Sequence, residues 1–214
     1  MVMSMDNLRL YLTYWHYDKN GRCKQFKHMR SHSFVGNFFK MIYLIMGKAA
    51  SYTTPGSTTQ MLTPYIENRY VDVTGVARDR MVVVADPIIA GSGVTNRGII
   101  VGTGGNPVTL HDFALQSQIP HGTDTGQLIY SAMSDTDVQP IFTGSATSWY
   151  YDIYRVFRNG STSVPNIREV GLVAAWYDGD TLTPVLIARD VLITAIALEP
   201  EDQAMIRYRL RVTV

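Results

Sequence analysis

Two histidine–aspartate pairs come nearest, by residue type and spacing, to catalytic chemistry. His111-Asp112 and the run from His121 to Asp124 could each supply a general base and the carboxylate that orients it. Both lie in turn-rich segments, where histidine and aspartate side chains commonly bond to the backbone. Ser117 and Ser131, the nearest candidate nucleophiles, lack the flanking glycines of a nucleophile elbow. We therefore predict no catalytic residues and no enzyme activity.

Two carboxylates inside predicted strands are a second candidate for chemistry. Glu169 follows Arg168 and Asp190 follows Arg189. Paired carboxylates can hydrolyse glycosides, but they need a cleft that perturbs their ionisation, and the sequence predicts none. We expect these residues to form ion pairs or contacts between neighbouring strands.

Four potential zinc ligands lie close together near the N-terminus: His16, Cys23, His28 and His32. If residues 18–21 form a four-residue turn, His16 lies opposite Cys23 on the same face of a hairpin. His28 then points to the other face, because side chains alternate along a strand. The second cysteine of a typical structural zinc module is absent. The sequence predicts a hairpin with no metal and no cofactor.

The glycine-rich run Gly102-Thr-Gly-Gly105 follows an apolar strand, as a phosphate-binding loop would. Such loops need a helix N-terminus directly after the glycines, and here Asn106-Pro107-Val108 follows instead. We interpret the run as a tight turn that uses positive φ angles.

Positive charge is concentrated near the N-terminus. Residues 1–50 carry a formal charge of +6 and the remainder −5, and every lysine lies at or before Lys48. The segment Arg22–Arg30 interleaves basic residues with Phe26. It could contact nucleic acid, dock on an acidic protein neighbour or form a solvated hairpin; we expect a protein partner more than nucleic acid.

The C-terminal strand presents a row of arginines on one face. Ile206, Tyr208 and Leu210 alternate with Arg207, Arg209 and Arg211. Such a row is either solvated or meets carboxylates of a neighbouring strand or subunit.

Period-two alternation and turn residues predict an all-β fold, a β-sandwich or jelly-roll-like domain. A hairpin is expected around residues 18–21, followed by one apolar helix that begins near Ser33 and ends near Gly47. Further hairpin turns are expected at Asn159-Gly160 and Asp178-Gly179. The remaining strands are predicted at 70–76, 80–85, 98–102, 127–133, 147–158, 167–177, 185–192 and 204–214.

The chain divides into three segments that form one structural unit. Residues 1–50 are a basic hairpin-plus-helix arm, 51–64 a Ser/Thr/Gly-rich loop, and 65–214 the sandwich. The longest apolar run, 34–46, has 13 residues, fewer than the roughly 20 of a membrane span. We expect no signal peptide and no membrane partner, and a single cysteine excludes an internal disulfide.

Several motifs resemble a β-rich family of structural proteins from tailed bacteriophages and prophages. The motifs are Met29–Phe38, Gly98–Gly104, Ile119–Gly122, Gly126–Tyr130, Arg155–Gly160, Ile167–Leu172 and Leu186–Leu192. The resemblance implies a virion component, assembled in the host cytoplasm, and transfers no catalytic residues.

The sequence thus predicts a virion structural protein that self-associates, as a trimer or ring, and docks on major capsid or tail proteins by multivalent contacts. The expected interface residues are Arg22, Lys24, Lys27, Arg30, Phe34, Phe38, Ile42, Arg207, Arg209 and Arg211. One alternative is a receptor- or glycan-binding module of a tail or head fibre that stacks sugars on Tyr150, Tyr151 and Trp176. A second alternative is a cellular filament or surface subunit. A third is an enzyme such as a depolymerase, which would need a clustered pair of carboxylates.

Overall fold

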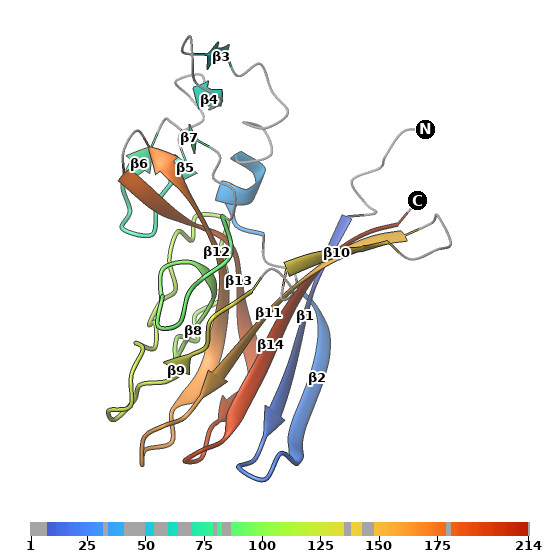
Figure 1. Cartoon of the computed structure of the whole chain (residues 1–214), viewed down its shortest axis with the longest axis vertical. Coiled ribbons are helices and arrows are strands. Elements are labelled where there is room, and N and C mark those ends of the chain that lie inside the picture. The colour runs from blue at the N-terminus through green and yellow to red at the C-terminus, as the bar shows by residue number, and fades with distance from the viewer. Residues whose placement is uncertain are drawn as a thin grey trace.

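Most of the chain is in antiparallel β-strands, as the alternation of apolar and polar residues predicts. The computed structural model describes residues 8–31, 34–40, 50–53, 60–63, 70–78, 81–82, 87–134, 138–142, 148–178 and 181–213. Within these residues two six-stranded sheets face each other and form a β-sandwich (Figure 1). The predicted all-β fold is therefore confirmed.

The first sheet, sheet A, has the strand order β10-β11-β14-β1-β2, with β9 also paired to β11. Its first and last strands in sequence, β1 and β14, are neighbours along their whole length, from Leu8↔Val212 to Tyr17↔Gln203. The strands of sheet A are β1 (Leu8–Tyr17), β2 (Cys23–Ser31), β9 (Ile129–Tyr130), β10 (Val138–Phe142), β11 (Ser148–Arg158) and β14 (Gln203–Thr213).

The second sheet, sheet B, has the order β13-β12-β7-β4-β3, with β8 also paired to β12. Its strands are β3 (Ala50–Thr53), β4 (Gln60–Thr63), β7 (Met81–Val82), β8 (Gly98–Gly102), β12 (Asn166–Asp178) and β13 (Thr181–Ala197). A two-stranded sheet pairs β5 (Tyr70–Val71) with β6 (Ala77–Arg78). The segment predicted as a loop at 51–64 thus contains part of a hairpin, β3–β4.

One continuous core fills the space between the sheets. Leu12 and Ile206 of sheet A and Val170 of sheet B are each fully buried. Tyr208 reaches across the sandwich from β14, and its hydroxyl donates to the carbonyl of Val170 at 3.1 Å. Ser31 adds a second bond between the layers, from its hydroxyl to Asp190 at 2.8 Å.

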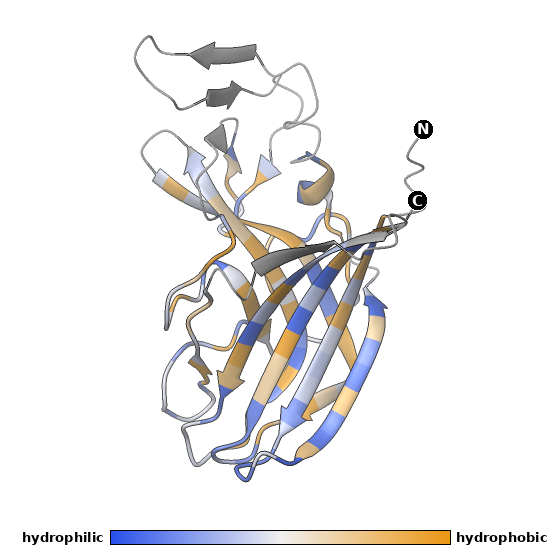
Figure 2. Cartoon of the chain, turned by 45° about the vertical axis from the view of Figure 1, so that its right-hand side comes forward, coloured by the Kyte–Doolittle hydropathy of each residue, from blue (hydrophilic) through white to orange (hydrophobic). Residues whose placement is uncertain are grey.

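The two sheets differ in what covers their outer faces. Every residue of β12 from Glu169 to Trp176 is buried, because connecting segments within 87–134 pack on the far side of sheet B. Leu115, for example, lies against Gly171. The strands of sheet A instead alternate between hydrophobic and hydrophilic residues (Figure 2).

Two of the predicted turns have different outcomes. Asp178 pairs with Thr181, so β12 and β13 form the expected hairpin. Asn159-Gly160 does not close a hairpin, because β11 and β12 belong to different sheets. The buried Asn159 amide donates to the carbonyls of Ser163 and Leu198 at 2.7 and 2.8 Å. These bonds fix the segment in which the chain passes from β11 of sheet A to β12 of sheet B.

The predicted apolar helix is described only in its first part. Residues 36–40 are helical, and 41–49, which include Ile42, lie outside the described residues, as does Ser33. Phe34 forms an isolated bridge with Ala188 of β13 and stacks on Phe38, with ring centroids 3.7 Å apart. The start of the helix is thereby fixed to the edge of sheet B.

Candidate functional site

The outer face of sheet A brings together all three arginines of the C-terminal row. Pairing between strands places Arg211 between Tyr150 of β11 and Arg9 of β1, and Arg209 between Asp152 and Tyr11. We call this surface the arginine face; its residues are Arg9, Arg30, Arg207, Arg209 and Arg211, with Tyr11, Thr13, Trp15, His28, Tyr150, Asp152 and Tyr154 among them.

Asp152 anchors the centre of the arginine face. Its carboxylate is 2% exposed and accepts two hydrogen bonds from Arg209, from Nε and Nη2, each 2.6 Å long. The guanidinium also lies 3.9 Å above the Tyr150 ring, a close cation–π distance. The hydrogen bond to Asp152 raises the pKa of Arg209. This arginine is therefore held in one position by a fork of bonds and a ring.

Arg207 is fixed by aromatic rings and hydroxyls more than by charge. Its guanidinium lies 5.2 Å from the Trp15 ring and 5.8 Å from the Tyr154 ring, and it donates to Thr13 Oγ1 at 3.0 Å. Asp152 is 3.7 Å away. Two arginines of the row thus share one carboxylate of a neighbouring strand, which is one of the two outcomes expected from the sequence.

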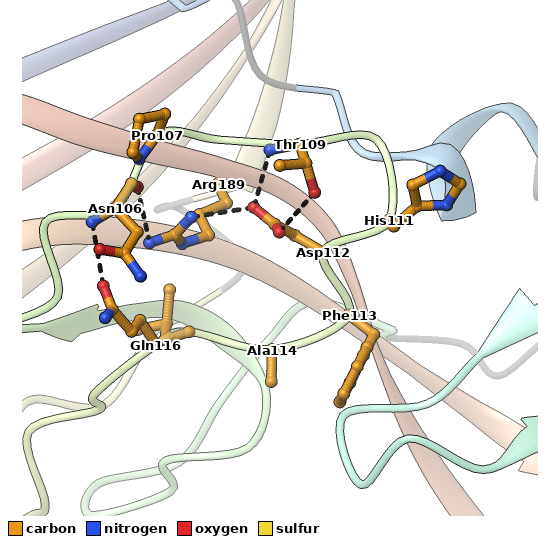
Figure 3. Close-up of a pocket in the computed structure, with 10 residues that line it drawn as sticks. Asn106, Pro107, Thr109, His111, Asp112, Phe113, Ala114, Gln116 and Arg189 are labelled. Atoms are coloured by element: carbon orange, nitrogen blue, oxygen red, sulfur yellow. Dashed lines mark hydrogen bonds and ion pairs between the residues drawn. The ribbon is translucent and has the colours of Figure 1, made fainter.

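A second hollow beside a charged group lies on the other side of the molecule, at Arg189 of β13. It has a volume of about 400 Å³ and is lined by residues 106–107, 109, 111–116 and Arg189 (Figure 3). Arg189 donates to Glu169 and Asp112, both at 2.8 Å, and to the carbonyl of Asn106 at 3.3 Å. These three bonds hold the Arg189 guanidinium against groups of the protein itself.

Glu169, fully buried, organises the loop around this hollow. It accepts hydrogen bonds from the backbone N–H groups of Gly104, Gln116 and Ser117 at 3.0, 3.0 and 2.7 Å. The backbone N–H of Gly104, in the glycine run, thus binds a carboxylate of the protein itself. The run was predicted to use positive φ angles, which is wrong. Glycine is needed at 102 and 104 because Glu169 lies so close that a larger side chain would clash with it.

The structure separates the candidate catalytic residues. Asp112 bonds to Thr109 and Arg189; burial opposes its ionisation, but these hydrogen bonds outweigh burial and lower its pKa. His121 accepts a hydrogen bond at Nδ1 from the backbone N–H of Tyr130 at 3.1 Å. Asp124 is exposed. Asp112 and His121 thus each have a structural hydrogen bond of the kind that turn residues make.

Two of the potential zinc ligands, His16 and His28, have other partners, and His32 lies outside the described residues. A bulge between His16 and Tyr17 shifts the hairpin, so that Tyr17 pairs with Cys23; the predicted pairing of His16 with Cys23 is wrong. Buried His16 bonds to Asp202 at 2.7 Å, and His28 bonds to Thr13 at 2.8 Å. Among the described residues, no group of histidine, cysteine and carboxylate side chains could hold a metal ion.

The predicted basic residues of the hairpin, Arg22, Lys24, Lys27 and Arg30, are exposed along β2 and its turn. Lys24 binds Asp202 at 2.9 Å, in the same cluster as His16. Phe34 is half-buried and Phe38 is 5% exposed, so Phe38 belongs to the core. Two aromatics of this region are exposed, Phe26 of β2 at 57% and Phe39 at the start of the helix at 48%.

Sequence reasoning missed a hollow next to Phe39 that has both apolar and charged residues in its lining. It has a volume of about 280 Å³ and is lined by Leu8, Arg9, Leu10, Arg30, Ser31, Phe34, Phe39 and Leu110. We call it the Phe39 hollow. Leu110, 64% exposed, comes from a distant loop, so no local pattern could have shown it.

The residues proposed for sugar stacking lie in different layers. Trp176 is 4% exposed and meets Tyr70 edge-on at 5.9 Å, inside the core. Tyr151 packs against the core cluster, and Tyr150 lies on the arginine face under Arg209. They do not form one platform.

Comparison with known proteins yields no relative. No family model matches the chain, and no curated protein or solved structure is significantly similar. In the described part of the chain, no helix is long and apolar enough to span a membrane.

Proposed function

We propose that this chain is a structural protein of a tailed-phage virion, which self-associates and docks on capsid or tail proteins. The observation that carries the proposal is the Phe39 hollow. Phe39 and Leu110 expose 48% and 64% of their surfaces beside two arginines, Arg9 and Arg30. Exposed apolar groups gathered around a hollow and rimmed by charge are typical of protein interfaces.

The resemblance of the strand and turn motifs to phage structural proteins supports the same class. Docking through such a patch needs only modest affinity per copy, because many linked contacts raise avidity. The proposal includes no catalytic step.

The first test is to quantify the protein by mass spectrometry in density-gradient-purified particles from its source, relative to the major capsid protein. Hundreds of copies indicate a lattice, decoration or tail-tube component, and a few to a dozen a connector or tail tip. Absence from the particles contradicts the proposal.

A second test addresses the hollow itself. Phe39→Asp should leave a folded protein, because half of the ring is already exposed, and should weaken self-association measured by analytical ultracentrifugation. Ile193→Asp is the control, since Ile193 is 90% exposed and lies outside the hollow. Equal self-association of wild type and Phe39→Asp would contradict a role for the hollow.

A further inference from the structure

We propose that the arginine face is a docking site for a carboxylate-rich surface of a folded protein partner. The first observation is its charge. Five arginines and one aspartate, Asp152, give this face a formal charge of +4 among the described residues. Asp152 is buried, bonded to Arg209 and paired with Arg207, so it offers nothing to Arg9, Arg30 and Arg211.

The second observation is the arrangement of the three remaining arginines. Arg9 and Arg211 are direct cross-strand partners, and Arg30 lies opposite Tyr11 on the next strand. Like charges directly opposite each other destabilise a sheet. Within the part of the chain that the structure describes, none of the three forms an ion pair. A bound anion would relieve this repulsion.

The third observation concerns the aromatic rings, and it distinguishes between classes of anion. Arg209 lies over Tyr150 and Arg207 over Trp15. Tyr11 stacks on His28 with centroids 5.4 Å apart. Single-stranded nucleic acid needs free rings on which bases can stack, and sugars use aromatic faces in the same way, whereas here Tyr150 and Trp15 hold arginines and Tyr11 stacks on His28. What remains available are guanidinium N–H groups, which match carboxylates.

The spread of the arginines suits the acidic surface of a folded protein. Arg211 is on β14, Arg9 on β1 and Arg30 on β2, so the charges cover three adjacent strands. A two-dimensional set of arginines is complementary to a flat protein surface that carries several aspartates or glutamates.

The test uses the full chain and immobilised poly-L-glutamate as the carboxylate probe, with oligothymidylate and heparin for comparison. In biolayer interferometry Arg211→Glu should raise the Kd for poly-L-glutamate about tenfold, which corresponds to about 1.4 kcal/mol. Arg168→Glu is the matched control, with the same charge change at an exposed residue of β12. It should change the Kd less than about twofold, and binding should weaken as salt is raised.

Circular dichroism melting checks that both variants are folded, and Arg211→Gln should give an intermediate loss. Equal losses in Arg211→Glu and Arg168→Glu, or no binding to poly-L-glutamate, would overturn the inference. Tighter binding to oligothymidylate or heparin, lost in Arg211→Glu, would replace the protein partner by a nucleic acid or a sulfated glycan. Arg211 does not line the Phe39 hollow, so this site and the proposed function can fail separately.

Discussion

Replacing Arg155 with methionine should destabilise the protein by about 2–3 kcal/mol. Arg155 points from β11 into the core and is 2% exposed. All its bonds go to backbone carbonyls: Nε to Ser131 at 3.0 Å, Nη1 to Arg97 and Ile99 at 3.2 and 3.0 Å, and Nη2 to Gly91 and Val94 at 3.2 and 2.8 Å. A single side chain therefore ties the segment 91–99 and Ser131 to sheet A.

The expected loss of stability follows from the carbonyl groups that lose their hydrogen bonds to Arg155. Ile99 is fully buried, and an unsatisfied carbonyl there costs about 2–3 kcal/mol. The other four carbonyls belong to residues that are at least partly exposed, so water can replace the arginine at roughly 0.5–1 kcal/mol each. Against this, burial lowers the pKa of Arg155 from 12.5 to about 10, so the buried charge itself costs about 3 kcal/mol, which methionine avoids.

The assay is urea unfolding followed by tryptophan fluorescence, with Arg158→Met as the control. Arg158 is on the same strand, but it is half exposed and forms one 3.3 Å ion pair with Glu201, worth less than about 0.5 kcal/mol. Hydrogen exchange should also speed up at Gly93, whose N–H bonds to the carbonyl of Tyr130. A loss below about 1 kcal/mol in Arg155→Met, or an equal loss in Arg158→Met, would refute the reasoning.

Three further outcomes are expected. Phe38→Asp should prevent folding, since the ring is buried and an unpaired carboxylate would enter the core, and the soluble yield measures this. Glu169→Gln should lower the free energy of unfolding by about 3 kcal/mol and expose residues 103–118 to limited proteolysis, because one amide cannot replace a carboxylate that binds three backbone N–H groups and Arg189. Asp202 is stabilised as an anion: burial opposes its ionisation, but bonds from Lys24 and His16 outweigh burial and lower its pKa. The stabilisation is present above the unfolded value of 3.8 and is lost as pH falls toward the lower folded value, so the stability difference between wild type and Asp202→Asn should shrink between about pH 5 and pH 3 in urea titrations.

The long strands could be predicted from the sequence because alternation and turn residues are local signals. The strand predicted at 70–76 was wrong beyond Val71, because the chain turns there between β5 and β6. The strand at 98–102 and the hairpin at Asp178 follow from residues within a few positions of each other. The crossing between the sheets at Asn159 could not be predicted. The Asn159 amide that fixes it donates to the carbonyl of Leu198, which is 39 residues away in the sequence. The bulge at His16 is similar, because buried His16 bonds to Asp202 at the far end of the chain. Both errors arose where a long-range partner overrode a local turn preference.

The candidate sites divide in the same way. The arginine row was visible from period-two alternation, and Asp152 could have been added, because Tyr150, Asp152 and Tyr154 share a face of their own strand. The Phe39 hollow could not be predicted, because it joins β1, β2, the start of the helix and a loop residue, Leu110. Phe38 and Phe39 are adjacent aromatics of equal hydrophobicity, but Phe38 stacks on Phe34 and is 5% exposed, whereas Phe39 is 48% exposed.

The difference between the two outer faces explains where a partner can bind. In β12, Val170 to Trp176 is a continuous apolar run, a pattern that indicates burial on both faces; the chain itself covers that sheet with its segment 87–134. In β14 the apolar residues alternate with Arg207, Arg209 and Arg211. Connecting segments of the chain therefore cover the outer face of sheet B, whereas on sheet A the charges of Arg9, Arg30 and Arg211 have no ion-pair partner among the described residues. A partner that supplies carboxylates would complete sheet A as the connecting segments complete sheet B.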